Sequence, residues 1–278
     1  MTRLSVLIVA EPGFGTSIQD SGRPGWAHLG VAGSGSMDPL LADQLNRLVG
    51  NPTSAAVLET AGGLVLRADG PLTVAVTPDV ATHHVPDGAS LRIDPHPDDV
   101  WGYVAVRGGI AAEPALGSRS RDSRSGIGPP VPRAGDRLTI GPAPAGGIVV
   151  DQGAPPVRRD TFDVWPGPRQ NWFTDESWTR LTTTTWEVTA DVSRVGARCQ
   201  GPALTRVADG ELASEGMVPG SIQVPGDGQP VVMLRDHPTT GGYPVIAVVD
   251  PDGLADLAQA RPGAKLRFRP AAGAFDRT

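Results

Sequence analysis

The sequence lacks several features that mark common functional classes. It has one cysteine, Cys199, so no disulfide can form within the chain. Its charges are balanced, with Lys+Arg 24 against Asp+Glu 30 and no long run of one sign, which argues against nucleic-acid binding. No apolar stretch has the length needed to cross a bilayer. We therefore expect a cytoplasmic protein with no nucleic-acid or membrane partner.

Motifs for metals and nucleotides are also missing. There is no HExxH and no CxxC pattern, and His83, His84 and His96 have no ligand partners at suitable spacing. Gly33–Ser36 is rich in glycine but has neither the P-loop lysine nor the dinucleotide fingerprint. We expect no metal in this chain, and we expect Cys199 to be a small buried side chain.

What the sequence does contain is glycine and proline, Gly 36 and Pro 28, close to a quarter of the chain and spread between short apolar runs. That pattern is typical of many turns between short strands, and it favours a mainly β fold of barrels or sandwiches. The N-terminal apolar run is broken at Glu11 and favours a first strand over a signal peptide. The expected strands are Leu4–Val9, Gly63–Leu66, Leu72–Val76, Leu91–Ile93, Trp101–Val106, Arg137–Ile140, Gly147–Val150, Asp163–Trp165, Thr185–Val188, Val231–Leu234 and Val245–Val249.

Only three segments predict helices. Met37–Val49 opens with Asp38-Pro39, an N-cap followed by proline at the first helical position, and is expected to end at Gly50. Its leucines at helical spacing are expected to share one face: Leu40, Leu41, Leu45 and Leu48. The other two helices are expected in Thr174–Leu181 and Gly253–Ala260.

The densest proline and glycine segment, Pro142–Arg159, is the expected boundary between two domains. A fresh strand, Asp163–Trp165, follows it. We therefore predict an N-terminal domain over residues 1–156 and a C-terminal domain over residues 157–278.

Two polar segments in the first half have side chains suited to binding or catalysis. In Gly15–Gly25, Gln19, Asp20 and Arg23 supply an amide, an acid and a guanidinium within five positions. Asp20 and Arg23 can meet only if Ser21-Gly22 turns, either to form a site or to fix a loop. In Gly33–Asn46, the glycine-rich approach to a helix favours anion binding. There Asp38 is either an N-cap or an acid, and Asn46 can project toward the same site.

Two more polar segments lie in the second half. Arg194 and Arg198 are separated by an even number of residues, so within one strand they would share a face and could clamp a carboxylate or phosphate. The alternative is a pair of surface arginines. Asp236-His237 begins a turn dense in hydrogen-bonding groups, where His237 is either structural or an acid–base group near neutral pH.

Seven stretches together resemble the family of biotin-dependent carboxyltransferase-like proteins. This family includes the carboxyltransferase-like component of bacterial 5-oxoprolinase, allophanate hydrolase subunit 2, a kinase-inhibitor antagonist of bacilli and part of the carboxyltransferase domain of urea carboxylase. The matching stretches are GTSIQDSGRPGWAHLGV (15–31), GSMDPLLADQLNRLVGNP (35–52) with Leu58-Glu59 after it, GSRS (117–120), PGPRQNWF (166–173), SRVGARCQGP (193–202), SEGMVPGSIQVPGDGQP (214–230) and DHPTTGGYP (236–244). The chain departs from the pattern after GSRS, where Arg121–Gly126 replaces an apolar residue and a longer glycine-rich loop.

The resemblance implies two cyclophilin-like β-barrel domains with a few short helices. It also implies partners: a related cyclophilin-like component of 5-oxoprolinase, of the allophanate hydrolase subunit 1 type, and a third, barrel-like component. The implied reaction is the opening of 5-oxoproline to glutamate, coupled to ATP hydrolysis. The chain would then be one component of a hydrolase that acts on a cyclic amide, with ATP bound by this chain or by a partner.

The same resemblance implies roles for residues in the matching stretches. Carboxylates would handle protons or polar contacts, arginines would hold anions, and amide or hydroxyl groups would position the substrate. The catalytic candidates are Asp20, Asp38, Glu59, Glu215 and Asp236. The substrate-binding candidates are Gln19, Arg23, Asn46, Arg119, Arg194, Arg198, Gln223, His237 and Tyr243.

Two other functions fit the same resemblance. One is carboxyl transfer from carboxybiotin to a urea-like nitrogen, for which biotin would come from another chain because this one has no Met-Lys acceptor pair. The other is a non-enzymatic antagonist that binds a kinase-inhibitor partner. The two alternatives differ from the amidohydrolase in the reaction that a reconstituted complex performs.

Overall fold

The computed structural model describes residues 6–207, 210 and 212–273, which divide into two compact units. Unit 1 holds the residues up to Pro24 together with Ser34–Val157. Unit 2 holds Gly25–Gly33 together with the described residues from Arg158 on. Each unit has its own core and is described by itself.

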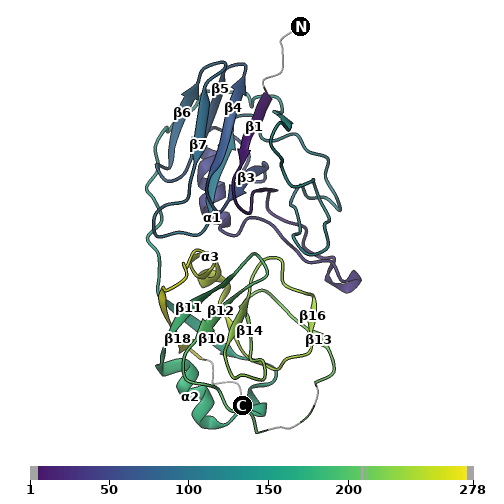
Figure 1. Cartoon of the computed structure of the whole chain (residues 1–278), viewed down its shortest axis with the longest axis vertical. Helices are drawn as coiled ribbons and strands as arrows, with labels where there is room; N and C mark the ends of the chain where they lie inside the picture. Colours follow the sequence, from purple (N-terminus) through teal and green to yellow (C-terminus); the bar gives the residue numbers. More distant parts are fainter. Residues whose placement is uncertain (1–5, 208–209, 211, 274–278) are drawn as a thin grey trace. The chain divides into compact units, whose positions relative to one another are not determined.

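Unit 1 is built from nine strands in two antiparallel sheets (Figure 1). The five-stranded sheet has the order β2-β3-β8-β5-β6 and the four-stranded sheet the order β7-β4-β1-β9. The strands are β1 (Val6–Pro12), β2 (Ser17–Gln19), β3 (Val57–Thr60), β4 (Leu64–Asp69), β5 (Leu72–Val76), β6 (Ala81–Val85), β7 (Ser90–Ile93), β8 (Gly102–Val106) and β9 (Arg137–Thr139).

Alternating side chains from both sheets form the core of unit 1. In β4, Leu64 and Leu66 are buried while Arg67 faces solvent, so one face of the strand is apolar. Every residue of β8 is buried, as expected for the central strand of its sheet. Leu58 and Val104 pair across β3 and β8 within the same apolar cluster. The two sheets of unit 1 thus form a closely packed apolar core, and the polar loops extend from it.

Helix α1 (Pro39–Leu48) begins as the sequence predicts, because the Asp38 side chain accepts a hydrogen bond from the Leu41 amide at 3.0 Å and Pro39 follows it. Leu41, Leu45 and Leu48 are buried, but Leu40 is 70% exposed. The expectation that Leu40 shares their face is therefore wrong, since a residue next to Leu41 is rotated by about 100° around the helix.

Unit 2 is a closed barrel of seven strands in the order β10-β17-β14-β15-β12-β11-β18 (Figure 1). A parallel pair between β10 and β18 completes the ring, and a separate two-stranded ribbon joins β13 to β16. The strands are β10 (Thr161–Pro166), β11 (Thr185–Val192), β12 (Gly196–Gln200), β13 (Glu215–Gly216), β14 (Ser221–Gln223), β15 (Val231–Met233), β16 (Thr240–Gly241), β17 (Val245–Val249) and β18 (Lys265–Pro270).

The barrel core of unit 2 contains large aromatic side chains. Trp186, Phe162 and Phe268 are almost completely buried, and the Trp186 indole donates to the Leu181 carbonyl at 3.0 Å. Leu181 belongs to α2 (Asp175–Thr183), which is capped by Thr174 as predicted. The remaining helical pieces are α3 (Leu254–Ala258) and the 3-10 turns η1 (Ala27–Leu29), η2 (Gln170–Trp172) and η3 (Pro251–Gly253).

The prediction of a mainly β fold with a few short helices is confirmed. Of the two expected β-barrel domains, unit 2 is a closed barrel, whereas the described strands of unit 1 form two sheets. The strand predicted at Gly147–Val150 is wrong, because Val149 is 95% exposed and the segment pairs with no strand among the described residues. Leu4 and Ser5 of the first predicted strand lie outside the described residues. The expected strands include no counterpart of β2, β3, β6, β12, β13, β14, β16 or β18.

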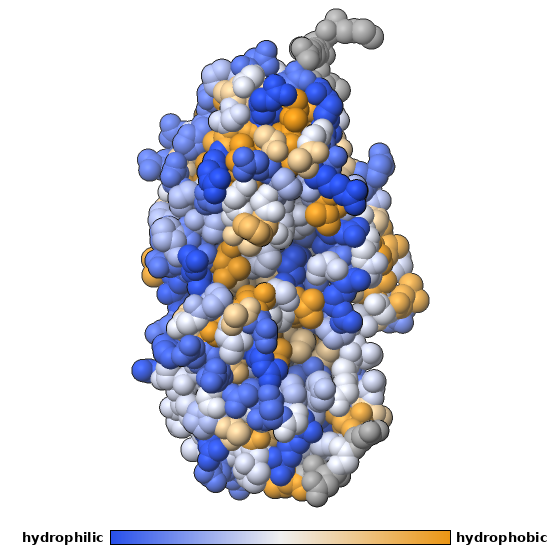
Figure 2. Space-filling view, viewed as in Figure 1, coloured by the Kyte–Doolittle hydropathy of each residue, from blue (hydrophilic) through white to orange (hydrophobic). Residues whose placement is uncertain are grey.

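The viewed surface mixes hydrophilic residues with small apolar patches, without one dominant apolar face (Figure 2). Across the described ranges, the helices are all too short or too polar to span a bilayer.

We predict that Gly201→Ala destabilises unit 2. A Cβ at Gly201 would lie 2.6 Å from the buried Trp186 ring, so the aromatic core must shift. Overpacking of this kind lowers the free energy of unfolding by about 1–3 kcal/mol. Gly226→Ala is the matched control, because a Cβ there meets nothing within 4 Å. Urea denaturation of both variants measures the difference, and equal stabilities would contradict the assignment of Trp186 as a rigid core residue.

Candidate functional site

Asp20 is the centre of the polar network in unit 1. Its Oδ1 accepts hydrogen bonds from the Ser118 hydroxyl at 2.5 Å, the Ser120 hydroxyl at 2.6 Å and the Gly22 amide at 2.8 Å. Its Oδ2 accepts from the Arg119 amide at 2.5 Å. The carboxylate therefore holds the GSRS segment onto the loop that follows β2. Asp20 thus organises this loop through its hydrogen bonds.

Arg23 and Gln19 fasten the same loop from other sides. The Arg23 guanidinium is buried and donates to the backbone carbonyls of Ala115 and Ser120. Ser21-Gly22 does turn, as an Asp20–Arg23 site would require, but the described hydrogen bonds of Arg23 go to the backbone.

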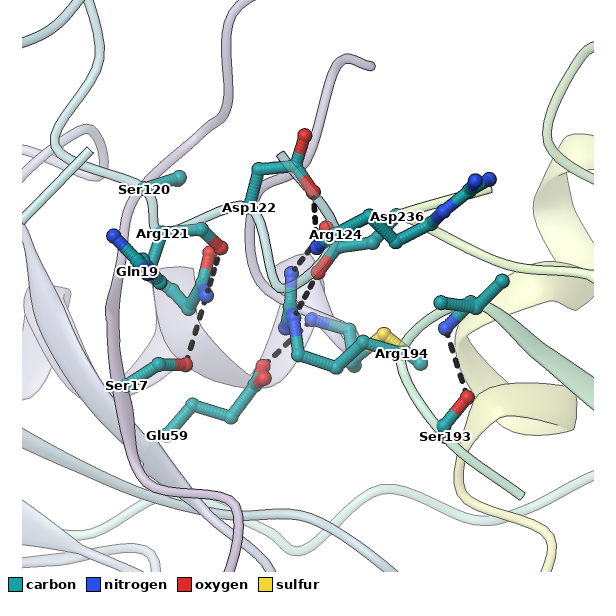
Figure 3. Close-up of polar contacts among 12 residues, drawn as sticks. Ser17, Gln19, Glu59, Ser120, Arg121, Asp122, Arg124, Ser193, Arg194 and Asp236 are labelled. Atoms are coloured by element: carbon teal, nitrogen blue, oxygen red, sulfur yellow. Dashed lines mark hydrogen bonds and ion pairs between the residues drawn. The ribbon is translucent and has the colours of Figure 1, made fainter. Parts of the chain in front are cut away.

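Gln19 is completely buried in β2, between Ser17 and Arg121 (Figure 3). Its Nε2 donates to the Ser17 hydroxyl at 2.8 Å and to the Arg121 carbonyl at 2.9 Å. Its Oε1 is buried with no hydrogen-bond partner among the described residues. The side-chain amide thus ties β2 to the segment after GSRS.

A second polar chain joins β3, β8 and the start of α1. The Tyr103 hydroxyl donates to Glu59 Oε2 at 2.7 Å and accepts from the Asp38 amide at 2.8 Å. Glu59 Oε2 also accepts from the Met37 amide at 2.7 Å. Burial and the neighbouring carboxylates raise the pKa of Tyr103 well above its usual value, so its hydroxyl keeps its proton. Glu59 and Asp38 are brought together through this hydroxyl.

Asn46 does not face this chain. Its Nδ2 donates to the carbonyls of Thr53 and Ala55, and its Oδ1 accepts from Asn51 Nδ2 at 3.1 Å. The prediction that Asn46 shares a site with Asp38 is therefore wrong. Asn46 closes the loop after α1, because it lies near the helix C-terminus rather than at its start.

The divergent run after GSRS is an ordered turn. Asp122 is buried, its Oδ1 accepts from the Arg124 amide at 2.9 Å, and its Oδ2 accepts from the Ser125 hydroxyl at 2.5 Å (Figure 3). The Gly126 amide returns to the Asp122 carbonyl at 3.0 Å. These contacts form a short turn organised by a carboxylate.

In unit 2, Arg194 and Asp236 form a buried bidentate ion pair (Figure 3). The guanidinium Nε lies 2.8 Å from Asp236 Oδ2 and Nη2 lies 3.1 Å from Oδ1. The Asp236 amide also donates to the Arg194 carbonyl at 2.8 Å. Two of the sequence-predicted residues are thus paired with each other, as a cation and its counter-ion.

The expected arginine clamp of unit 2 is wrong. Arg194 lies in a bend before β12, whereas Arg198 lies within that strand, so even spacing along one strand does not apply. Arg198 forms an ion pair with Asp227, whose side chain is half exposed. Each arginine therefore has its own carboxylate, which sequence spacing alone does not reveal.

Glu215 has a partner that the sequence did not single out. Arg169, from the PGPRQNWF stretch, binds both carboxylate oxygens of Glu215, with Nε 2.9 Å from Oε2. The Arg169 guanidinium also lies 5.9 Å from the centre of the Trp172 ring. Its hydrogen bond lowers the pKa of Glu215, so this carboxyl stays ionised and is poorly suited to donate a proton.

The remaining candidates of unit 2 serve the turn at 236–244. The Gln223 side chain is buried and donates to the Tyr243 carbonyl at 3.0 Å, while Tyr243 itself is 52% exposed. His237 is buried, with Nδ1 2.7 Å from the Pro238 carbonyl. Because a carbonyl only accepts, Nδ1 carries a proton.

Cys199 is a buried thiol, and desolvation raises its pKa to about 12, which makes it inert near neutral pH. In the described parts of the chain, no three His, Cys, Asp or Glu side chains gather in a way that could hold a metal ion.

Sequence reasoning missed four polar residues in these networks. Ser118 and Ser120 lie in the GSRS stretch but carry no charge that marks them, and Tyr103 lies in a strand that is otherwise apolar. Arg169 lies in a stretch that the resemblance did identify. The only signal for Tyr103 in the sequence is its place in a strand that is otherwise apolar. A tyrosine hydroxyl buried in such a strand requires a hydrogen-bond partner.

The two units define a mainly β protein with a closed barrel and polar loops held by buried carboxylates. A family model described as "Carboxyltransferase domain, subdomain A and B" matches residues 29–270. The chain belongs to this carboxyltransferase domain family.

Two bacterial relatives match the chain over most of its length, and both are named as subunits of 5-oxoprolinase. The chain is 32% identical to the one from Escherichia coli (strain K12), over 95% of this chain and 90% of the relative. It is also 32% identical to the one from Haemophilus influenzae, over 91% and 87%. Urea amidolyase of Lachancea kluyveri is 28% identical over 94% of this chain, which spans only 17% of that protein. All three relatives are enzymes or enzyme subunits by name.

Solved structures share the fold. The crystal structure of TTHA0988 has a TM-score of 0.83 and 37% identity, and this chain spans 56% of its length. The crystal structure of the K. lactis urea amidolyase has a TM-score of 0.87 and 26% identity over 97% of this chain and 19% of that one.

We predict that Glu215 titrates below an ordinary glutamate. Its folded-state pKa is lowered by Arg169, so the pair stabilises the fold above the ordinary pKa and this contribution is lost as pH falls through the lowered value. In Arg169→Gln, the pKa should rise to the ordinary range. Carboxyl-carbon NMR titration measures it.

Arg269→Gln is the matched control, because it removes the partner of Asp163 instead and should leave the titration of Glu215 unchanged. The same Glu215 pKa with and without Arg169 would show that the ion pair does not persist in solution.

Proposed function

We propose that the chain is one component of a heteromeric, ATP-dependent amidohydrolase that opens 5-oxoproline to glutamate. The observation that supports it most strongly is the reciprocal coverage of the 5-oxoprolinase relatives: 95% of this chain matches 90% of the E. coli protein. The match therefore covers most of both chains. Against urea amidolyase, in contrast, the chain corresponds to a small part of a much longer protein.

The chemistry of this reaction fits a site with shielded carboxylates. A lactam is an unreactive amide, so transfer of a phosphoryl group from ATP to its oxygen would activate the ring carbon toward water. Addition of one water and cleavage of the C–N bond, with a proton going to the nitrogen, would give γ-glutamyl phosphate, and a second water would release phosphate from it. The balance is 5-oxoproline, ATP and two waters giving glutamate, ADP and phosphate. Within unit 1 we propose that Glu59 handles a proton in this sequence, with Tyr103 as the positioning residue that holds its Oε2.

The complex is proposed to need a related partner and a third component, because the relatives are named as subunits of 5-oxoprolinase. The proposal places ATP in the assembled complex and the complex in the cytoplasm. Arg23, Asp20 and Gln19 then act as loop builders that shape the site rather than as groups in contact with the substrate.

Carboxyl transfer is the second candidate, supported by the likeness to the K. lactis urea amidolyase structure. In that case a carboxylated biotin carrier on another chain would deliver carbon dioxide to urea. The polar networks of unit 1 are compatible with either reaction, so the products of the assembled complex decide between them.

The test is reconstitution of the chain with its partner proteins in two separate mixtures. The first contains 5-oxoproline and ATP, and the second contains urea, bicarbonate, ATP and a biotinylated carrier with its carboxylase. We expect glutamate and phosphate in the first mixture and no ATP-dependent carboxylation of urea in the second. Carboxylated urea alone would establish carboxyl transfer, and tight assembly without turnover in either mixture would establish a regulatory role.

Variants of the Glu59 chain test the proposed proton transfer. Glu59→Gln should lower kcat by about 100-fold or more, since general acid–base catalysis contributes about 10²–10⁴-fold. Tyr103→Phe should lower kcat less and shift the pH profile, because the carboxylate remains but loses one hydrogen bond. Glu11→Gln is the matched control, as this glutamate is exposed on β1. Wild-type kcat in assembled Glu59→Gln would contradict the role.

A further inference from the structure

Unit 1 contains a pocket that borders the loops held by Asn46 and Asp20. Its volume is about 460 Å³, within the range of small-molecule sites. It lies between the loop after α1, the loop after β8 and the segment after β9. Its lining is mostly apolar or backbone, from Ala55, Ala56, Ile110, Pro142 and Pro144 among others.

Arg119 gives this pocket its charge. Among the described residues that line the pocket, Arg119 is the only charged one, and no carboxylate faces it. The Arg119 amide is held by Asp20 Oδ2 at 2.5 Å, and its side-chain Nε donates to the Ala112 carbonyl at 2.7 Å. Nη1 and Nη2 have no partner among the described residues. The guanidinium of this pocket-lining residue is thus anchored through Nε and keeps two donors for a ligand.

Two of the glycines that line the pocket approach each other closely. A Cβ at Gly108 would lie 2.3 Å from the Gly141 carbonyl oxygen, and one at Gly141 would lie 2.5 Å from the Gly108 carbonyl oxygen. Gly108 also has a positive φ of 100°. Any side chain at these positions would push the two segments apart, so the glycines keep these two segments close together.

The number of hydrogen-bond donors that remain free in the pocket decides which kind of anion it can bind. The amides of Gly108, Gly109 and Gly141 already donate to Asn51 Oδ1, the Val106 carbonyl and the Gly109 carbonyl. A phosphate needs several donors, which this backbone does not offer. A carboxylate needs two, and the Nη1–Nη2 edge of one arginine matches it in a bidentate pair.

We propose that this pocket binds a compact monocarboxylate, with Arg119 pairing its carboxylate and Ala55, Ile110 and Pro142 contacting its apolar body. Arg119 was expected to hold an anion from its place in GSRS, and the structure identifies the pocket and the class of ligand. The inference does not depend on the proposed activity, although cyclic monocarboxylates such as 5-oxoproline belong to the same class.

Direct binding to the full chain tests this proposal. The probes are cyclopentanecarboxylate, its neutral analogue cyclopentanecarboxamide, and inorganic phosphate, each titrated by ligand-observed NMR. We expect cyclopentanecarboxylate to bind at least tenfold more tightly than the other two. Arg119→Gln should lower its affinity at least tenfold, because a neutral amide cannot replace the charged pair.

Two further variants keep the test decisive if Arg119→Gln unfolds. Ala55→Leu should weaken binding by filling the pocket while leaving Arg119 in place. Arg133→Gln, which removes an exposed arginine of unit 1 that does not line the pocket, should change nothing. Binding that survives both Arg119→Gln and Ala55→Leu, tighter binding of phosphate, or no binding of the carboxylate would overturn the proposal.

Discussion

The polar architecture of unit 1 depends on one carboxylate, that of Asp20. Its two oxygens collect four donors, one from the adjacent turn and three from residues 118–120. Bringing residues 118–120 to Asp20 closes a long segment of the chain and costs conformational entropy. Several charge-assisted hydrogen bonds to one carboxylate can offset that cost. Once closed, the loop places the Ser120 carbonyl against Arg23 and the Arg121 carbonyl against Gln19. It also fixes the backbone of Arg119 beside the pocket.

In unit 2, ion pairs hold the loops in position. Arg194–Asp236 is buried, while Arg169–Glu215 and Arg198–Asp227 are partly exposed. A buried pair adds little net stability, because desolvation offsets most of its attraction, but loss of one partner leaves a costly isolated charge. These pairs therefore fix the position of loops more than they stabilise the barrel. Arg119 differs, since its guanidinium has a backbone partner and no carboxylate.

The sequence predicted the fold well wherever local chemistry decides it. Asp38-Pro39 and Thr174 cap helices as expected, and β5 and β17 have the predicted bounds. Gly147–Val150 has the composition of a strand but no partner strand, and pairing is a tertiary property that a short apolar run does not encode. Short strands such as β2 and β14 were missed because each has only three residues, with a buried glutamine in it.

The site was harder to predict than the fold. Stretches that resemble the family did contain the networked residues, but spacing gave no indication of their partners. Arg194 and Arg198 were expected to act together, yet each binds an acid more than 25 positions away in sequence. Tyr103 was not identified at all, although its hydroxyl links Glu59 to the start of α1. Partners of this kind follow from strand register, which a single sequence does not determine.

Hydrogen exchange of the Arg119 and Arg121 amides in Asp20→Asn tests the central role of this carboxylate most directly. The Arg119 amide donates to Asp20 itself, and the Arg121 amide donates to the Ile18 carbonyl within the loop that Asp20 closes. The account predicts that both amides exchange at least tenfold faster in Asp20→Asn, while Asp136→Asn, which alters a local turn of the same unit, leaves them protected. Unchanged protection of both amides in a folded Asp20→Asn protein would contradict it.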